Sequence, residues 1–195
     1  MPRDTRVAYF SMEIALSPDM PTYAGGLGVL AGDTIRSCAD LGVNVVAVTL
    51  LHRKGYFRQL LDARGRQSEE PEKWPLERFL EPLNARVTVD IEGRPVEIRG
   101  WRYTVTGVNG AQVATHFLDT DLPENAAEDR RLTDSLYGGG ERHRLRQEVL
   151  LGIGGVKMLR ALGFHHLERY HLNEGHPALA ILALLEERHG DPPRS

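Results

Sequence analysis

The sequence predicts an α/β fold built around a parallel β-sheet, and two observations near the N-terminus carry this prediction. A short apolar segment, Val7–Phe10, is followed by a glycine-rich loop and then by an amphipathic stretch that continues to Leu41. A β-branched run, Asn44–Leu51, comes directly after it, and such runs are typical of parallel strands covered on both faces. Strand, helix and strand with short connections predict a right-handed βαβ unit, in which Gly42 ends the helix.

The middle of the chain predicts a β-rich excursion from this pattern. Gly55–Leu61 and the turn residues Asp62–Gly65 indicate a small hairpin. The next residues, 67–83, are polar and contain proline, so we expect them to be irregular. Three alternating segments then predict antiparallel strands, either at the edge of the main sheet or in a flap on it: Arg86–Ile91, Val96–Val105 and Gln112–Leu118.

The last third returns to helices and a strand. We expect a strand at Glu168–Leu172 and three helices, at Asn125–Tyr137, Glu141–Leu162 and Ala178–His189. Gly152, Gly154 and Gly155 lie inside the long helix, and we interpret them as sites of close packing against another backbone.

Composition limits the classes of function. A hydrophobic content of 41% and a net charge of −3 are those of an ordinary globular protein of 195 residues, without a basic stripe for nucleic acid or membrane. Cys38 is the single cysteine, and we expect it to pack in the core. The N-terminal residues lack the apolar run of a leader, and no segment reaches the ~20 apolar residues that a membrane-spanning helix needs. We therefore expect a cytoplasmic protein.

The glycine-rich loop is the strongest candidate binding site. Gly25, Gly26 and Gly28 immediately precede the first predicted helix, where free N–H groups and the helix dipole favour an anion or a cluster of sugar hydroxyls. Glycines also permit positive φ and a close approach of the backbone to a ligand. The spacing matches neither a dinucleotide fingerprint nor a P-loop. The alternative is a turn that only packs the helix against the sheet.

Polar residues also follow two strands where ligands collect in open α/β sheets. Glu13 comes after the first strand, although an exposed loop carboxylate is an alternative, and Asn173, Glu174 and His176 come after the last. Asp119 and Asp121 suggest either a metal or a turn, and the turn is favoured because no third ligand follows. No zinc motif, catalytic triad or other metal site is indicated.

Six motifs in a fixed order resemble the N-terminal part of α-glucan phosphorylases, the glycogen, starch and maltodextrin phosphorylase family, and most of all its compact bacterial-type branch. The resemblance extends from about Val7 to Glu187. The motifs are Phe10–Glu13, Tyr23–Asp33, Gly55–Gln59, Leu136–Gly139, Arg146–Glu148 and His171–Ala178.

This resemblance implies a Rossmann-like N-terminal lobe of a two-lobed, GT-B type glycosyltransferase. Such enzymes cleave terminal α-1,4-linked glucose from glucans with phosphate and release glucose 1-phosphate. The implied substrate-binding residues are Glu13, Tyr23, Gly25, Gly26, Leu27, Gly28, Asn173, Glu174 and His176, with no catalytic residue in this chain.

The resemblance also implies what the chain lacks. In the family, pyridoxal phosphate is held by a lysine of the C-terminal lobe, and Lys54, Lys73 and Lys157 do not stand in that motif. We therefore expect residues 1–195 to form one partial lobe that holds no cofactor and is inactive without a C-terminal lobe.

Two other functions stay open at this point. The N-terminal lobe of a sugar-nucleotide-dependent glycogen or starch synthase has a similar glycine loop, but a lysine usually precedes it, whereas this chain has Thr22, Tyr23 and Ala24. A non-catalytic glucan-binding remnant is the other alternative.

Overall fold

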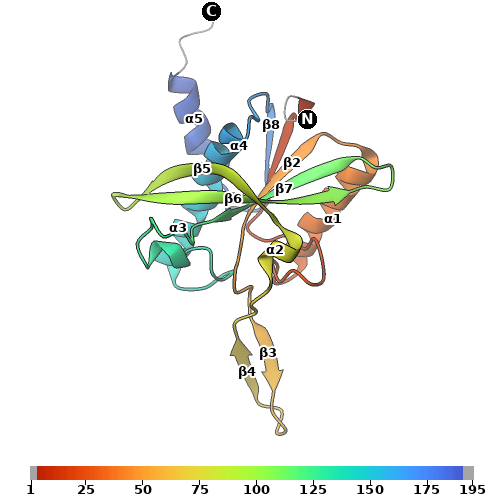
Figure 1. The fold of residues 1–195 in the computed structure, drawn as a ribbon, viewed down its shortest axis with the longest axis vertical. Coiled ribbons are helices and arrows are strands. Elements are labelled where there is room, and N and C mark those ends of the chain that lie inside the picture. Colours follow the sequence, from red (N-terminus) through yellow and green to blue (C-terminus); the bar gives the residue numbers. More distant parts are fainter. Residues whose placement is uncertain (1–3, 191–195) are drawn as a thin grey trace, which may run out of the picture.

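A computed structural model describes residues 4–190 of the chain (Figure 1). The first three residues, which belong to the N-terminal segment considered above for a leader, lie outside the described residues. Within the described residues, six strands form one sheet in the order β5-β6-β7-β2-β1-β8. These strands are β1 (Val7–Phe10), β2 (Val45–Leu50), β5 (Glu81–Ile91), β6 (Arg94–Thr106), β7 (Gln112–Asp119) and β8 (Arg169–Leu172). The helices are α1 (Gly26–Leu41), α2 (Leu76–Phe79), α3 (Glu141–Val149), α4 (Gly155–Ala161) and α5 (Ala180–Gly190).

The sheet is parallel at one end and antiparallel at the other. Strand β1 runs parallel to β2 and β8, and β2 runs parallel to β7. Strands β5 and β6 join antiparallel beside β7. This arrangement confirms the predicted α/β class and βαβ unit, and it places the antiparallel excursion at the edge of the main sheet rather than in a separate flap.

Helices cover both faces of the sheet (Figure 1). Along β1, Ala8 and Phe10 belong to the core beneath α3, α4 and α5, whereas Tyr9 belongs to the core beneath α1. Strand β2 alternates in the same way, with Val46 and Val48 on one side and Ala47 on the other. Because successive side chains of a strand point to opposite faces, an unbroken apolar run fills two cores.

The structure agrees with the predicted end of the first helix and with the predicted role of the glycines in the long helix. Helix α1 ends at Gly42, whose φ of 68° is left-handed. The predicted long helix is one helical stretch made of α3, a π-helical segment (Leu150–Gly154) and α4. A Cβ on Gly152 would lie 2.5 Å from the backbone nitrogen of Ala180, and one on Gly155 would lie 2.6 Å from the ring of Phe10. Close packing is thus confirmed at these glycines, against another backbone at Gly152 and against side chains at Gly154 and Gly155.

The residues expected to be irregular are partly ordered, so that expectation was wrong. They form β4 (Gln67–Glu70), which pairs with β3 (Arg58–Leu61), then α2 and the start of β5. The β3–β4 ribbon projects from the body of the molecule (Figure 1). Its β4 residues are all exposed, so neither face shows the apolar alternation by which strands are recognised.

The helix expected at Asn125–Tyr137 is also absent, since this segment forms turns and a 3-10 helix at Asp129–Arg131. The Asn125 amide donates to the carbonyls of Glu97 and Thr120, and Gln147 donates to the carbonyls of Leu132 and Ser135. The bond from Gln147 takes the Leu132 carbonyl, which a helix would use for its own backbone hydrogen bond.

Two smaller expectations concern Cys38 and the membrane. Cys38 is a free cysteine that is partly buried against the α1 side of the core, and burial raises the pKa of its thiol. No helix among residues 4–190 has the length and apolar character needed to cross a membrane.

Candidate functional site

Glu13 lies at the carboxyl end of β1 and is almost completely buried, with 3% of its surface exposed. One carboxylate oxygen accepts the backbone N–H groups of Ala24, at 2.6 Å, and Gly25, at 3.3 Å. The other accepts the hydroxyl of Tyr137 at 2.8 Å. The alternative of an exposed loop carboxylate was therefore wrong, and the protein's own carboxylate occupies the first amides of the glycine loop.

The amides that remain available belong to the first turn of α1. Helix N–H groups in this turn have no intrahelical acceptor, and α1 has no side-chain cap. The first intrahelical bond of this end runs from Val29 to the carbonyl of Gly25. The N–H groups of Gly26, Leu27 and Gly28 are thus the predicted anion or hydroxyl site, at the positive end of the helix dipole.

The loop glycines have two different environments. Added Cβ atoms on Gly25 and Gly26 would meet nothing within 4 Å, whereas one on Gly28 would lie 2.4 Å from the Cβ of Tyr23 and 2.8 Å from a Glu13 oxygen. None of these glycines has a positive φ, so the expected use of that freedom was wrong; Gly25 is extended, with φ of −166°. Gly28 is therefore required by packing, while Gly25 and Gly26 leave open space beside the backbone.

The three predicted site residues after β8 differ in burial and in their contacts. Asn173 is buried and donates to the hydroxyl of Ser11 at 3.1 Å, so its amide supports the chain that leads to Glu13. Glu174 is exposed and has a φ of 64°. His176 is half-buried, and its Nδ1 lies 3.2 Å from a carboxylate oxygen of Glu148.

Tyr137, which was not among the predicted site residues, joins the two groups of residues that were. Its hydroxyl binds Glu13, its ring lies 5.7 Å from the His176 ring, and the Arg144 guanidinium lies over it at 5.2 Å. Burial, and then the hydrogen bond to Glu13, raise the pKa of Tyr137, which therefore stays protonated as a donor. In the sequence, the motif Leu136–Gly139 could have pointed to Tyr137, because it places a tyrosine directly before a run of glycines. In the structure Tyr137 has a left-handed φ of 56°.

His52 holds the chain just before Glu13 in place. It is buried, and its Nε2 lies 2.8 Å from the carbonyl of Met12, next to Glu13. Burial lowers the pKa of His52 to about 4, so the ring is neutral and Nε2 carries the proton that it donates.

The aspartates after β7 form ion pairs. Asp119 is buried and accepts hydrogen bonds from Arg53, Arg99 and the Trp101 indole, at distances of 2.6 to 3.0 Å. Burial alone would raise the pKa of Asp119, but the Arg53 bond and charge outweigh it and lower this pKa to about 2. The backbone N–H of Asp121 donates to Asp119, which confirms the predicted turn. Among the described residues no cluster of three or more potential metal ligands occurs.

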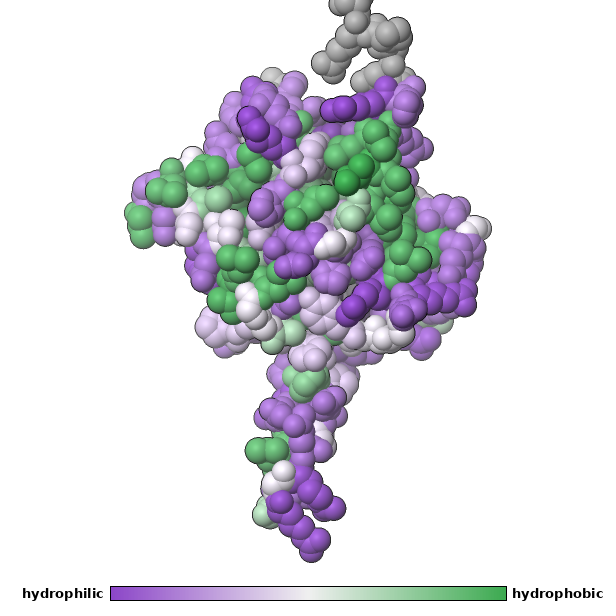
Figure 2. All heavy atoms as spheres, turned by 180° about the vertical axis from the view of Figure 1, so that it is seen from behind, coloured by the Kyte–Doolittle hydropathy of each residue, from purple (hydrophilic) through white to green (hydrophobic). Residues whose placement is uncertain are grey.

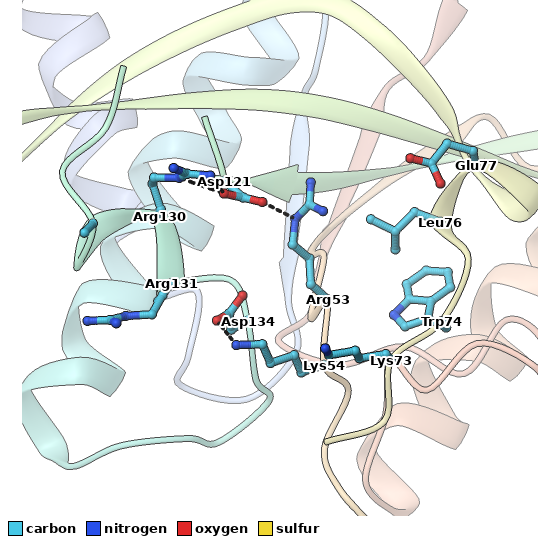
Figure 3. Close-up of a pocket in the computed structure, with 11 residues that line it drawn as sticks. Arg53, Lys54, Lys73, Trp74, Leu76, Glu77, Asp121, Arg130, Arg131 and Asp134 are labelled. Carbon is cyan, nitrogen blue, oxygen red and sulfur yellow. Dashed lines mark hydrogen bonds and ion pairs between the residues drawn. The ribbon is translucent and has the colours of Figure 1, made fainter. Parts of the chain in front are cut away.

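A cavity of about 480 Å³ lies beyond β2 and β7 on the same edge of the sheet (Figure 3). Figure 3 shows Arg53 and Arg130 directed toward Asp121, and Lys54 directed toward Asp134. Arg53, Lys54 and Arg130 are paired with these carboxylates, whereas Lys73 and Arg131 make no ion pair within residues 4–190. This cavity contains none of the site residues predicted from the sequence, which lie at the glycine loop and after β8.

Comparison with known proteins agrees with the resemblance in the sequence, although no protein-family model matches the chain. The chain is 43% identical over 181 residues to the maltodextrin phosphorylase of Thermococcus litoralis, which covers 89% of this chain and 21% of that protein. It is 41% identical over 194 residues to the glycogen phosphorylase of Mycobacterium tuberculosis, covering 94% of this chain and 22% of that protein. The glycogen phosphorylase of Aquifex aeolicus is 30% identical over 182 residues, with 26% of its length covered. The chain thus spans about a fifth to a quarter of the length of these relatives, and it belongs to the α-glucan phosphorylase family.

Proposed function

We propose that this chain supplies the glycine-loop part of an α-glucan phosphorylase centre, in which terminal α-1,4-linked glucose is transferred to phosphate to give glucose 1-phosphate. The relatives that support this activity are named maltodextrin and glycogen phosphorylase. Because the chain spans about a fifth of the length of these relatives, we further propose that residues 1–195 are a partial N-terminal lobe of a two-lobed, GT-B type enzyme. We propose that this lobe is inactive alone. A cytoplasmic location is part of this proposal, since a single cysteine suits a reducing compartment.

The observation that carries the proposal is the open backbone at Gly25 and Gly26. A sugar ring or a phosphate can approach the backbone at Gly25 and Gly26, because an added Cβ there would meet nothing within 4 Å, whereas Gly28 packs against Tyr23. Glu13 already satisfies the preceding amides and so fixes the loop before a ligand arrives. A site ordered in advance spends less binding energy on ordering itself.

His176, Glu174 and Tyr23 are proposed to line the glucan side of this centre. When Nδ1 of His176 donates to Glu148, Nε2 is left as an acceptor for a sugar hydroxyl. The exposed Glu174 carboxylate can accept a second hydroxyl. Asn173 acts indirectly, by supporting Ser11 and the chain before Glu13.

The family implies pyridoxal phosphate, but the lysines of this chain do not fit its covalent attachment. A lysine that forms a Schiff base is usually desolvated or otherwise kept neutral. Lys54 is ion-paired with Asp134 at 2.6 Å, Lys73 is exposed, and Lys157 donates to the Thr88 carbonyl at the exposed surface. We therefore assign no step through the cofactor to this chain and place its holder outside residues 1–195.

The test is release of glucose 1-phosphate from maltoheptaose and phosphate. We expect none from the 195-residue chain, and activity from a chimera in which it replaces the matching segment of the Thermococcus litoralis enzyme. A folded, cofactor-containing chimera without activity would contradict the proposal. No observation favours the synthase or the non-catalytic alternative.

A further inference from the structure

A second hollow begins at the glycine loop and extends away from it. Its volume is about 730 Å³, within the usual range of small-molecule sites. Three segments line it: residues 18–24, the start of the β3–β4 ribbon, and residues 72–79. We call it the aromatic groove, because Tyr23, Tyr56, Phe57, Trp74 and Phe79 all contribute to its walls.

The walls of the aromatic groove are fixed to one another without a ligand. The backbone N–H of Glu72 donates to the carbonyl of Lys54 at 2.9 Å, and the Trp74 indole N–H donates to the carbonyl of His52 at 3.1 Å. Gly55, with a left-handed φ of 62°, brings the backbone so close to Pro21 that an added Cβ would lie 2.9 Å from the proline ring. The groove is therefore a preformed feature of the fold.

The charges of the groove balance. Asp19, Glu72, Lys73 and Arg78 line it, two of each sign. Within the described residues their side chains make no ion pair or hydrogen bond, apart from the stacking of Arg78 on the Phe79 ring. The groove thus offers donors, acceptors and aromatic faces with no net charge, which suits a neutral ligand rich in hydroxyl groups rather than a phosphate or nucleotide.

We propose that the aromatic groove binds a segment of α-1,4-glucan at a distance from the reacting end, as a second binding site beside the glycine loop. The C–H faces of glucose rings carry a partial positive charge and pack against the electron-rich faces of aromatic rings, while hydroxyls at the ring edge bind charged side chains. Tyr56 is 41% exposed, and its ring meets that of Tyr137, which binds Glu13, so the groove is continuous with the candidate site. The identity of the ligand rests on the proposed function.

The 195-residue chain contains its own reporter for this binding. Its two tryptophans are Trp74, in the groove, and Trp101, which is 3% exposed and bonded to Asp119. Maltoheptaose should therefore change the emission of Trp74 and protect it from acrylamide, and celloheptaose should not. Tyr56→Ala and Arg78→Ala should each raise the dissociation constant for maltoheptaose about three- to tenfold, the size of one aromatic contact for Tyr56 and of one hydrogen bond for Arg78. Arg64→Ala, an exposed arginine on the ribbon outside the groove, is the matched control.

The chimera described above separates this inference from the proposed function. Its KM for long glucans should rise with Tyr56→Ala or Arg78→Ala, while the KM for phosphate and the kcat stay unchanged. If maltoheptaose binds the chain in this way but the chimera is inactive, the groove stands and the proposed function fails. An active chimera whose variants bind and process long glucans normally overturns the groove. Equal affinity for celloheptaose, or burial of Trp74 by self-association without sugar, also overturns it.

Discussion

Acidification from pH 7.5 to pH 5 should destabilise this chain through two buried histidines. His52 and His116 are 0% and 3% exposed, and burial lowers the pKa of each to about 4 from the usual 6.5. For His116 the nearby Arg102 charge acts in the same direction, and neither ring nitrogen has a hydrogen-bond partner. For His52 the Met12 carbonyl and Glu13 oppose the effect of burial without cancelling it.

The change in the free energy of unfolding with pH is set by the difference in proton binding between the folded and unfolded chain. Each histidine binds a proton less tightly in the folded protein than in the unfolded chain, so stability is fully present above pH 6.5 and falls as the pH approaches 4. At pH 5 the loss is about 2 kcal/mol for each ring, or about 4 kcal/mol for both. Domains of this kind are stable by only about 5–15 kcal/mol, so the effect should be large.

Urea unfolding followed by circular dichroism at pH 7.5, 6.5 and 5 measures this loss. His116→Leu should remove about half of the pH dependence, because the variant has no ring to protonate, and it should cost little at pH 7.5 because the nitrogens have no partner. His165→Leu, at an exposed position, is the control and should keep the full dependence. A wild-type loss below about 1 kcal/mol, or an unchanged dependence in His116→Leu, would refute the reasoning.

Three further predictions test the loop, the glucan side and the surface. Gly28→Ala should destabilise the chain by about 1–3 kcal/mol through overpacking, whereas Gly26→Val should leave thermal stability nearly unchanged and abolish phosphorolysis in the chimera; equal stability of the two variants would contradict the packing difference. His176→Ala should raise the glucan KM of the chimera with little change in melting temperature, and unchanged kinetics across several oligosaccharide lengths would exclude a binding role. Figure 2 shows apolar residues gathered at the upper right of that view, and Leu182 of α5 is 55% exposed; Leu182→Gln should weaken self-association in sedimentation experiments, and an unchanged association constant would exclude the α5 face as the contact.

The sequence by itself determined the α/β class, the βαβ unit and the position of the glycine loop at the carboxyl edge of the sheet. These features depend on local periodicity and on short connections between neighbours in the chain. The apolar, β-branched run Val45–Leu50 predicted a strand covered on both faces, and in the structure all of its residues are buried. Local patterns failed where the Gln147 side chain bound the Leu132 carbonyl that a helix would have used, and where β4 had no buried face.

Only the tertiary structure decided which groups meet at the candidate site. Glu13 binds Tyr137, 124 positions away, and thereby joins the glycine loop to the residues after β8. The structure also separated Gly28, which packs against Tyr23, from Gly26, which faces open space, although both belong to the same motif. The physical reason is that periodicity reports which face of an element is buried, whereas hydrogen-bond partners and free space depend on where distant segments come together.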